Sequence, residues 1–267
     1  MNIFQKTAAR IILKSIADDP MGKLPRMIDL AEKLDKGKRH TVQINGIRNM
    51  LLDEENVWHT FAKKLVDEVD RRVLQKFVEC FIINSNLTGE EKIRKAEEKY
   101  DCNIPWAILM DPTSACNLHC TGCWAAQYGD KNNLSFDVLD SICRQGKELG
   151  VYFYIFSGGE PLVRKKDIIK LCKKHNDCYF FAFTNGTLVD DELCKDMLEV
   201  ANFALAFSIE GDEKATDMRR GEGTYKKVIE AMEKLKKHKL LFGYSTCYHR
   251  YNTESVGSDE FVDDMIE

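Results

Sequence analysis

Apolar residues in the first hundred positions recur every three or four residues. They are Ile3, Phe4, Ala8, Ile11, Ile12 and Ile16 in one series and Val57, Phe61, Leu65, Val69 and Val73 in another. Residues at this spacing share one face of a helix, so the pattern predicts amphipathic helices and no strands. The stretch Thr88–Glu91 predicts the start of a further helix that ends near Lys99.

The pattern changes at Ile104, where short apolar runs begin to alternate with amphipathic segments. The predicted strands are 106–110, 151–156, 178–183, 202–209 and 240–247, and the predicted helices are 135–149, 165–175, 190–200, 224–238 and one from about 258. Apolar runs that alternate with helices are typical of parallel strands with helical crossovers. The sequence therefore predicts an all-helical domain over 1–103 and an α/β domain over 104–267.

Two architectures fit this rhythm, a doubly wound sheet and a (β/α) barrel. In both, ligands bind at the carboxyl ends of the strands, so chemistry is expected in the peptides that follow each strand. The sequence stops at Glu267 inside a predicted helix without a C-cap signal. We expect it to be a C-terminally truncated piece of a longer protein.

Composition narrows the class of protein. The 267 residues are 44% hydrophobic and 31% charged, which excludes a largely disordered chain, and the net charge of −4 argues against a nucleic-acid binder. No apolar run approaches the roughly 20 residues that span a bilayer, and the N-terminus lacks a signal peptide. Ten cysteines without an export signal predict a cytoplasmic protein with reduced thiols.

Three of the cysteines, Cys116, Cys120 and Cys123, are crowded into CNLHCTGCW directly after the first predicted strand. Asn, Thr and Gly between them are poor helix formers, so the segment reads as a loop in which the thiols can converge on a metal. A zinc site would need a fourth ligand, for which His119 is the candidate. An iron–sulfur cube held by three cysteines would keep one iron open.

The other cysteines and the histidines carry no such pattern. We expect Cys80, Cys102, Cys143, Cys172, Cys178, Cys194 and Cys247 to be small buried apolar residues. We expect His40, His59, His175, His238 and His249, which lie in polar stretches, at the surface.

The spacing C-x3-C-x2-C after the first strand of a β/α repeat resembles the signature of the radical S-adenosylmethionine (SAM) superfamily, and the likeness covers 104–267. It implies an incomplete parallel (β/α)6 barrel with a [4Fe–4S] cluster on Cys116, Cys120 and Cys123. In that family SAM binds the open iron and is cleaved by one electron to a 5′-deoxyadenosyl radical, which abstracts hydrogen from a substrate. The family's aromatic residue before the third cysteine is Gly122 here; Trp124, which follows Cys123, is the alternative adenine contact.

The later strands end in motifs that also resemble this family, and more narrowly its cofactor and peptide maturases. They are SGGEP at 157–161, TNGT at 184–187, SIEG at 208–211 and DMRRGEGTY at 217–225. The resemblance implies SAM contacts from Gly158, Gly159, Glu160, Thr184, Asn185, Ser208, Glu210 and Arg220. Asn252 resembles a further family position and is assigned no role.

The resemblance implies an enzyme supplied by a one-electron donor such as flavodoxin or ferredoxin. Hydrogen abstraction is the expected reaction, while methyl or adenosyl transfer from SAM stays open. The alternative from a different class is a non-catalytic binding domain stabilised by zinc. The substrate is unknown, with lipid and peptide as candidates. The peptide candidate follows from the likeness to peptide maturases. The lipid candidate follows from Lys6, Arg10 and Lys14, which lie on one face of the first predicted helix and could contact an anionic membrane.

Overall fold

The computed structural model describes residues 11, 19–35, 37, 38, 40–129 and 131–266. The predicted first helix, with its basic face of Lys6, Arg10 and Lys14, lies outside the described residues. No helix within the described ranges is both long enough and apolar enough to cross a membrane.

Helices account for the regular structure before residue 104, as the periodicity predicts. They are α2 (Leu24–Leu34), α3 (Thr41–Leu52), α4 (Val57–Glu68), α5 (Arg71–Lys76), the π-helix η1 (Phe77–Gly89) and α6 (Glu90–Tyr100). Side-chain caps begin two of them: Asn56 Oδ1 accepts from the Trp58 backbone N–H, and Asp70 Oδ1 accepts from that of Arg72.

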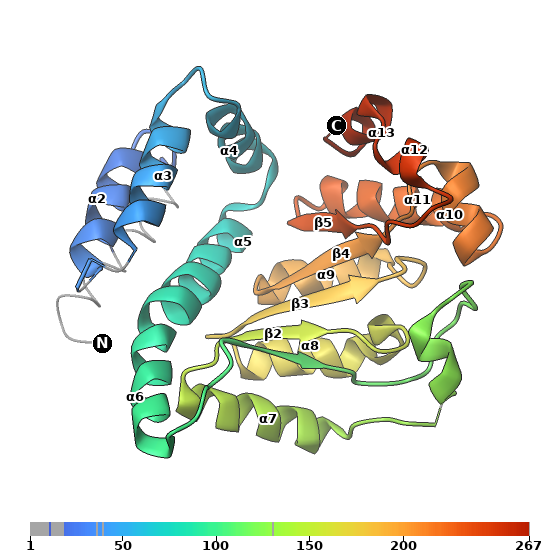
Figure 1. Ribbon diagram of the computed structural model, residues 1–267, viewed down its shortest axis with the longest axis horizontal. Coiled ribbons are helices and arrows are strands. Elements are labelled where there is room, and N and C mark those ends of the chain that lie inside the picture. Colours follow the sequence, from blue (N-terminus) through green and yellow to red (C-terminus); the bar gives the residue numbers. More distant parts are fainter. Residues whose placement is uncertain (1–10, 12–18, 36, 39, 130, 267) are drawn as a thin grey trace.

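The helix predicted to begin at Thr88–Glu91 does not start afresh there. Helix α6 continues directly from η1, and Gly89 and Glu90 both have right-handed helical backbone angles. Gly89 is needed at this point because a Cβ on it would lie 2.5 Å from the Gly150 carbonyl oxygen. Helices α5, η1 and α6 therefore form one long column beside the sheet (Figure 1).

The second half of the chain forms a five-stranded parallel sheet. Its strands are β1 (Ala107–Met110), β2 (Phe153–Phe156), β3 (Tyr179–Thr184), β4 (Phe203–Ser208) and β5 (Phe242–Ser245). They lie in the order in which they occur in the sequence, with every neighbouring pair parallel. A doubly wound sheet reverses its strand order, so this order selects the incomplete barrel.

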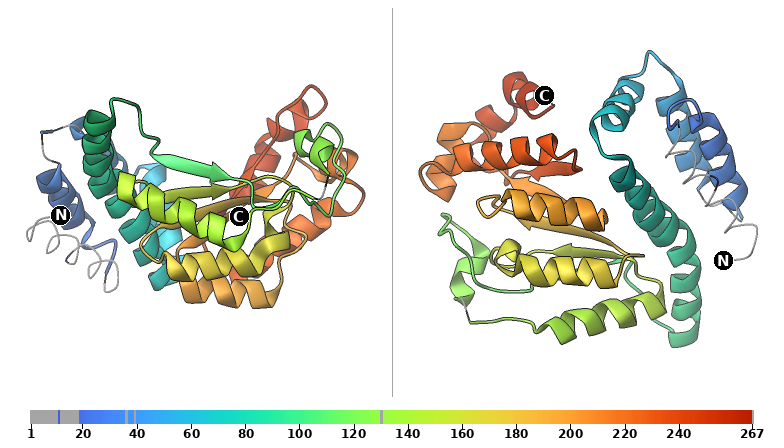
Figure 2. Two further views of the ribbon diagram at one scale, coloured as in Figure 1. Left: turned by 90° about the horizontal axis from the view of Figure 1, so that it is seen from below. Right: turned by 180° about the vertical axis from the view of Figure 1, so that it is seen from behind.

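The crossover helices cover one face of the sheet (Figure 2). They are α7 (Phe136–Leu149), α8 (Lys165–Lys174), α9 (Asp191–Val200) and α11 (Thr224–Lys237), and α12 (Thr253–Val256) and α13 (Asp259–Ile266) follow β5. Short 3-10 turns, η2 (Trp124–Tyr128) and η3 (Pro161–Arg164), lie near the first two strand ends.

One helix falls where a polar loop was predicted. Helix α10 (Glu213–Arg220) begins at Asp212, whose side chain accepts a 2.8 Å hydrogen bond from the Ala215 backbone N–H. It holds few apolar residues, so periodicity alone does not reveal it. Its cap and the contacts of its last two arginines with Glu210 stabilise it instead.

The two faces of the sheet have different environments because alternate strand residues point in opposite directions. Tyr154, Phe156, Phe180, Leu205 and Phe207 are buried beneath the crossover helices in the main core. The alternate positions belong to a second apolar cluster on the other face. Its members are Cys80, Phe153, Tyr179 and Ala204, with Phe77, Phe81, Ala107, Ile155 and Phe181 packed against them.

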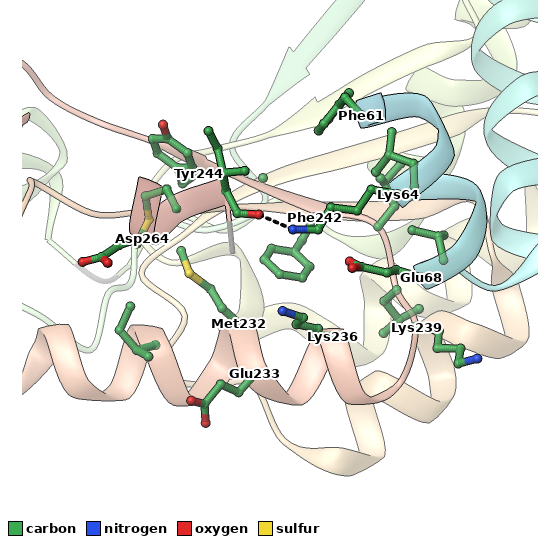
Figure 3. A pocket seen from close by; sticks show the side chains of 18 residues that line it. Phe61, Lys64, Glu68, Met232, Glu233, Lys236, Lys239, Phe242, Tyr244 and Asp264 are labelled. Atoms are coloured by element: carbon green, nitrogen blue, oxygen red, sulfur yellow. Dashed lines mark hydrogen bonds between the residues drawn. The ribbon is translucent and has the colours of Figure 1, made fainter. Parts of the chain in front are cut away.

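A cavity of about 490 Å³ lies at the outer edge of β5, among α4, α11 and α13 (Figure 3). Phe61, Met232, Phe242 and Tyr244 give it an apolar lining. Lys64 Nζ donates a 2.6 Å hydrogen bond to the Ile266 carbonyl across it. The cysteine loop and the motifs at the strand ends do not line this cavity.

Candidate active site

The cysteine loop is fixed to the carboxyl edge of the sheet by main-chain hydrogen bonds. The Gly159 N–H donates to the Thr113 carbonyl at 3.0 Å and the Glu160 N–H to the Ala115 carbonyl at 2.8 Å. Farther along the loop, the Thr121 N–H donates to the Arg219 carbonyl at 2.7 Å. The loop thus spans from the end of β2 to the end of α10.

The two glycines after β2 allow this close approach. A Cβ on Gly159 would lie 2.2 Å from the Ala115 carbonyl oxygen, and one on Gly158 would lie 2.6 Å from that of Thr113. Gly158 also has φ +103°, which disfavours any side chain. Both positions therefore leave an edge of bare backbone beside the cysteine loop.

Glu160 is buried and its carboxylate is bound on both oxygens. Oε1 accepts hydrogen bonds from the Leu162 N–H (2.9 Å) and the Thr184 hydroxyl (2.8 Å), and Oε2 accepts from the Asn185 N–H (2.8 Å). Burial raises the pKa of Glu160, while these donors act against the rise. The carboxylate therefore joins the end of β2 to the turn after β3.

The turn after β3 reaches the first cysteine. Asn185 Nδ2 lies 2.9 Å from Asn117 Oδ1 and 3.9 Å from Cys116 Sγ. Asn117 in turn donates to the Thr187 hydroxyl at 2.7 Å. The structure thus brings Thr184 and Asn185 together with Glu160 and Cys116.

Glu210 and Arg220, predicted as separate SAM contacts, bind each other. Arg220 donates from Nε (2.9 Å) and Nη2 (2.6 Å) to Glu210 Oε1, and Arg219 donates to the same oxygen. Oε2 accepts from the Cys247 N–H at 3.1 Å. A fully buried carboxylate needs such partners, because an unpaired charge is costly away from water.

Ser208 lies at the end of β4, in register with Ser245 of β5. Among the described residues its hydroxyl has no hydrogen-bond partner. Asp217 holds the loop that follows Arg220, because its carboxylate accepts from the Gly223 N–H (2.6 Å) and the Tyr225 N–H (2.8 Å).

The three thiols share one electrostatic environment. Burial raises the pKa of Cys116 and of Cys120, and each pKa is raised further by the neighbouring cysteines. Arg220 and Arg219 act in the opposite direction on Cys120, favouring its thiolate. Within the described ranges, no three Cys, His, Asp or Glu side chains gather around a single ion-sized position.

Trp124 is exposed and packs edge-to-face against Tyr128, with ring centroids 5.9 Å apart. Both rings line a cavity of about 240 Å³ together with Asp111, Ser114 and the two glycines of the GGE motif. The cavity adjoins the cysteine loop, and burial raises the pKa of Asp111.

Several residues of this edge have functions that the sequence motifs did not predict. Asn252 is buried and donates from Nδ2 to the carbonyls of Glu210 (2.9 Å) and Cys247 (3.0 Å). Arg219 shares Glu210 with Arg220, and Asn117 joins the cysteine loop to β3. Arg219, like Asp217, belongs to the DMRRGEGTY motif, and Asn252 was noted as a family position without a role, whereas no local signal marks Asn117.

Three expectations about burial are wrong. Cys102 and Cys247 are exposed, unlike the five other isolated cysteines, which are buried. His175 is only 4% exposed and lies 2.9 Å from Asp140. Each error has the same cause: local sequence polarity does not report which surface a neighbouring element covers.

A sequentially ordered parallel sheet with three cysteines after its first strand defines a class of iron–sulfur barrel enzymes. The sequence profile of the Radical SAM superfamily matches residues 110–256. The chain belongs to this superfamily. It is therefore an enzyme whose chemistry uses SAM and a [4Fe–4S] cluster, and a zinc-stabilised binding module is not favoured.

Similar proteins include a sulfatase-maturating enzyme and a heme synthase. The cysteine-type anaerobic sulfatase-maturating enzyme of Clostridium perfringens is 30% identical over 159 residues, which are 52% of this chain and 43% of that protein. The AdoMet-dependent heme synthase of Methanosarcina barkeri is 28% identical over 160 residues, 58% of this chain and 46% of that one. The chain spans less than half the length of these relatives.

Solved structures share the fold. The enzyme anSMEcpe with bound AdoMet aligns with a TM-score of 0.52 at 26% identity, covering 59% of this chain and 48% of that chain. Streptococcus suis SuiB bound to its precursor peptide SuiA aligns with a TM-score of 0.55 at 20% identity, covering 67% and 40%. The second likeness concerns the fold alone.

The residues present fit the two cofactors. Cys120 and Cys123 lie close enough to Cys116 to raise its pKa, and the three thiols supply soft ligands for iron. The bare backbone at Gly158 and Gly159 leaves room beside them for a ligand to approach.

Proposed function

We propose that this enzyme cleaves SAM reductively and that the resulting 5′-deoxyadenosyl radical abstracts a hydrogen atom from its substrate. One observation carries the proposal: the three-cysteine loop is hydrogen-bonded to the GGE strand and to the arginine helix at the same edge of the sheet. A cluster and SAM would therefore be held side by side. When bound, the cluster supplies the electron that breaks the S–C5′ bond.

Cys116, Cys120 and Cys123 are the proposed cluster ligands. Arg219 and Arg220 stand near Cys120 and favour its thiolate, which is the form that binds iron. Burial still raises the pKa of Cys120, and the two arginines oppose that rise.

The proposed SAM contacts come from the ends of β2, β3 and β4 and from α10. They are Gly158, Gly159, Glu160, Thr184, Asn185, Ser208, Glu210 and Arg220. Glu160 and Glu210 hold neighbouring groups through their own hydrogen bonds, so we propose that they act mainly by positioning Asn185 and Arg220. Ser208 offers a hydroxyl to a ligand, and Arg220 is suited to a carboxylate.

We further propose a cytoplasmic enzyme that receives electrons from a flavodoxin or ferredoxin. The reduced thiols support that location, since all ten cysteines are free. The division at residues 103 and 104 stays a prediction. Because η1 packs on the sheet, we propose that the helical segment contributes to the core of the catalytic part.

The test is product analysis under anaerobic conditions. Protein reconstituted with iron and sulfide, dithionite and SAM should hold about four irons and release 5′-deoxyadenosine. Cys120→Ala should abolish both, whereas Cys102→Ala, which alters an exposed cysteine outside the loop, should change neither. S-adenosylhomocysteine as the sole product would indicate methyl transfer, and a colourless protein without 5′-deoxyadenosine would refute the proposal.

A further inference from the structure

Two consecutive arginines at the end of α10 share one oxygen of a buried carboxylate. Arg219 donates from Nη1 and Arg220 from Nε and Nη2, and all three donors reach Glu210 Oε1. A carboxylate oxygen offers about two lone-pair positions, so three N–H groups are more than it needs. The ion pairs around Glu210 also hold two positive charges against one negative charge. One arginine is therefore sufficient to satisfy this oxygen and to balance its charge.

Glu210 itself is fixed in place. Its Oε2 accepts from the Cys247 N–H, its own N–H donates to the Thr216 hydroxyl at 3.0 Å, and its carbonyl accepts from Asn252. These partners come from α10 and from the segment after β5. The Glu210 side chain is fully buried, so it cannot turn to water if its arginines leave. Any rearrangement at this carboxylate must therefore come from the arginines.

The two arginines differ in what lies beyond Glu210. Burial raises the pKa of Glu160, and Arg220 is among the groups that act against this rise. Burial also raises the pKa of Cys120, and Arg220 opposes that rise more strongly than Arg219 does. The Nη1 atom of Arg220 has no hydrogen-bond partner among the described residues, although this side chain is only 11% exposed. Arg220 therefore faces the cysteine loop and the GGE motif with one end of its guanidinium open to an anion.

Arg219 is anchored at both its main chain and its side chain. Its carbonyl accepts from the Thr121 N–H of the cysteine loop at 2.7 Å. Its side chain, which is 17% exposed, ends on Glu210 through a single nitrogen. Arg219 is therefore placed to remain on the carboxylate when Arg220 turns away from it.

We propose that Arg219 is a positioning residue that keeps Glu210 paired, so that Arg220 is free to bind the carboxylate of SAM. This inference rests on the proposed function and concerns how its SAM site works. SAM carries one carboxylate, and the planar guanidinium of an arginine matches a carboxylate in two parallel hydrogen bonds. Without Arg219, the departure of Arg220 would leave Glu210 as a buried, unpaired charge, and this cost would weaken SAM binding. Arg219 itself touches no ligand.

Binding is tested by isothermal titration calorimetry of the cluster-loaded protein with SAM and with decarboxylated SAM, which lacks the carboxylate. Arg219→Gln should weaken the binding of SAM about tenfold and leave that of decarboxylated SAM unchanged. Arg219→Lys, which keeps the positive charge, should restore most of the SAM affinity. The control is Lys214→Gln, which removes a positive charge from an exposed position on the same helix and should change neither affinity.

A double variant separates this role from a purely structural one. When Arg219→Gln is combined with Glu210→Gln, no buried charge holds Arg220, so the SAM affinity should rise again towards that of the wild type. A double variant that binds SAM no better than Arg219→Gln alone would overturn the inference. Equal weakening of SAM and decarboxylated SAM in Arg219→Gln would overturn it as well, because Arg219 would then only hold the fold together.

Turnover distinguishes this inference from the proposed function. At saturating SAM, Arg219→Gln should form 5′-deoxyadenosine at the wild-type rate, with the KM for SAM raised about tenfold. The expected affinities without 5′-deoxyadenosine from any variant, the wild type included, would refute the proposed function and leave the inference standing. Unchanged SAM affinity in Arg219→Gln, with 5′-deoxyadenosine still formed, would refute the inference and leave the proposed function standing.

Discussion

At the scale of single residues, two glycines determine how closely the GGE strand can approach the cysteine loop. Gly159 and Gly158 face carbonyl oxygens of the loop, and backbone atoms cannot move aside as a flexible side chain can. Gly46 and Gly243, by contrast, have no other atom within 4 Å of the position that a Cβ would take. Glycine is therefore required at both positions because a Cβ would collide with the loop, and at Gly158 also because of its positive φ.

Replacing Gly159 by alanine should separate the loop from the strand. We expect Gly159→Ala to lower the free energy of unfolding by about 2 kcal/mol or more and to weaken SAM binding, because overpacking against backbone forces the main chain apart. Urea denaturation and SAM titration measure the two effects. The control is Gly46→Ala in α3, where nothing lies within 4 Å of the new Cβ, and a helical alanine should stabilise.

His175 is the other residue whose environment has a measurable consequence. Its Nε2 pairs with Asp140, while its Nδ1 is buried without a partner among the described residues. Burial lowers the pKa of His175 below the usual 6.5, with Lys147 acting in the same direction and Asp140 and Asp177 opposing. The folded protein therefore takes up the proton at lower pH than the unfolded chain does.

The sign of the pH dependence follows from this difference. As pH falls through about 6.5, the unfolded state gains a proton before the folded state, so stability should decrease between pH 7.5 and 5.5. Urea denaturation across this range should show a shallower decrease for His175→Gln, which can still donate to Asp140. Equal slopes in the two proteins would contradict the assignment.

At the scale of elements, the column of α5, η1 and α6 packs against the face of the sheet opposite the crossover helices, near the amino ends of the strands. Sequence periodicity predicts its helices but not the π-helical stretch, because Asn84, Asn86 and Gly89 suggest a break there instead. Packing decides otherwise: Phe77 and Phe81 reach the sheet, and Asn84 donates to the Asp177 carbonyl at 2.9 Å. These contacts stabilise a helix that continues through residues 77–89 without a break.

Removal of the Phe81 ring, which lies between η1 and the sheet, tests this packing. Phe81→Ala should lower the free energy of unfolding by about 2–3 kcal/mol, because Phe81 contacts four other rings and leaves a cavity between η1 and the sheet. Phe61→Ala, at a position 46% exposed, should cost less than about 1 kcal/mol. Comparable losses in both variants would show that η1 does not anchor the sheet.

At the scale of the whole molecule, the site is assembled from every strand of the sheet and from α10. A ligand that contacts several strand ends should therefore stabilise the entire α/β part. With the cluster present, SAM at a hundred times its dissociation constant should stabilise the protein by about 2.7 kcal/mol. Removal of the iron by a chelator should abolish the SAM-dependent rise in Tm, measured calorimetrically; a rise that persists would place SAM binding elsewhere.

The sequence by itself determined the helices and strands and the types of residue that form the site. Strand and helix periods, the spacing of Cys116, Cys120 and Cys123, and the motifs after each strand are all local patterns, and local conformation follows from them. The same holds for capped helices such as α7, where the Ser135 hydroxyl accepts from the Val138 N–H.

Only the tertiary structure decided which groups meet. It paired Glu210 with Arg219 and Arg220, bound Glu160 to Asn185, gave Asn252 its two carbonyls and placed η1 against the face of the sheet opposite the crossover helices. The strand order, and with it the choice of a barrel over a doubly wound sheet, also came from the fold. The physical reason is that these contacts join residues far apart in the chain, where packing and burial of charge, and not local periodicity, set the energy.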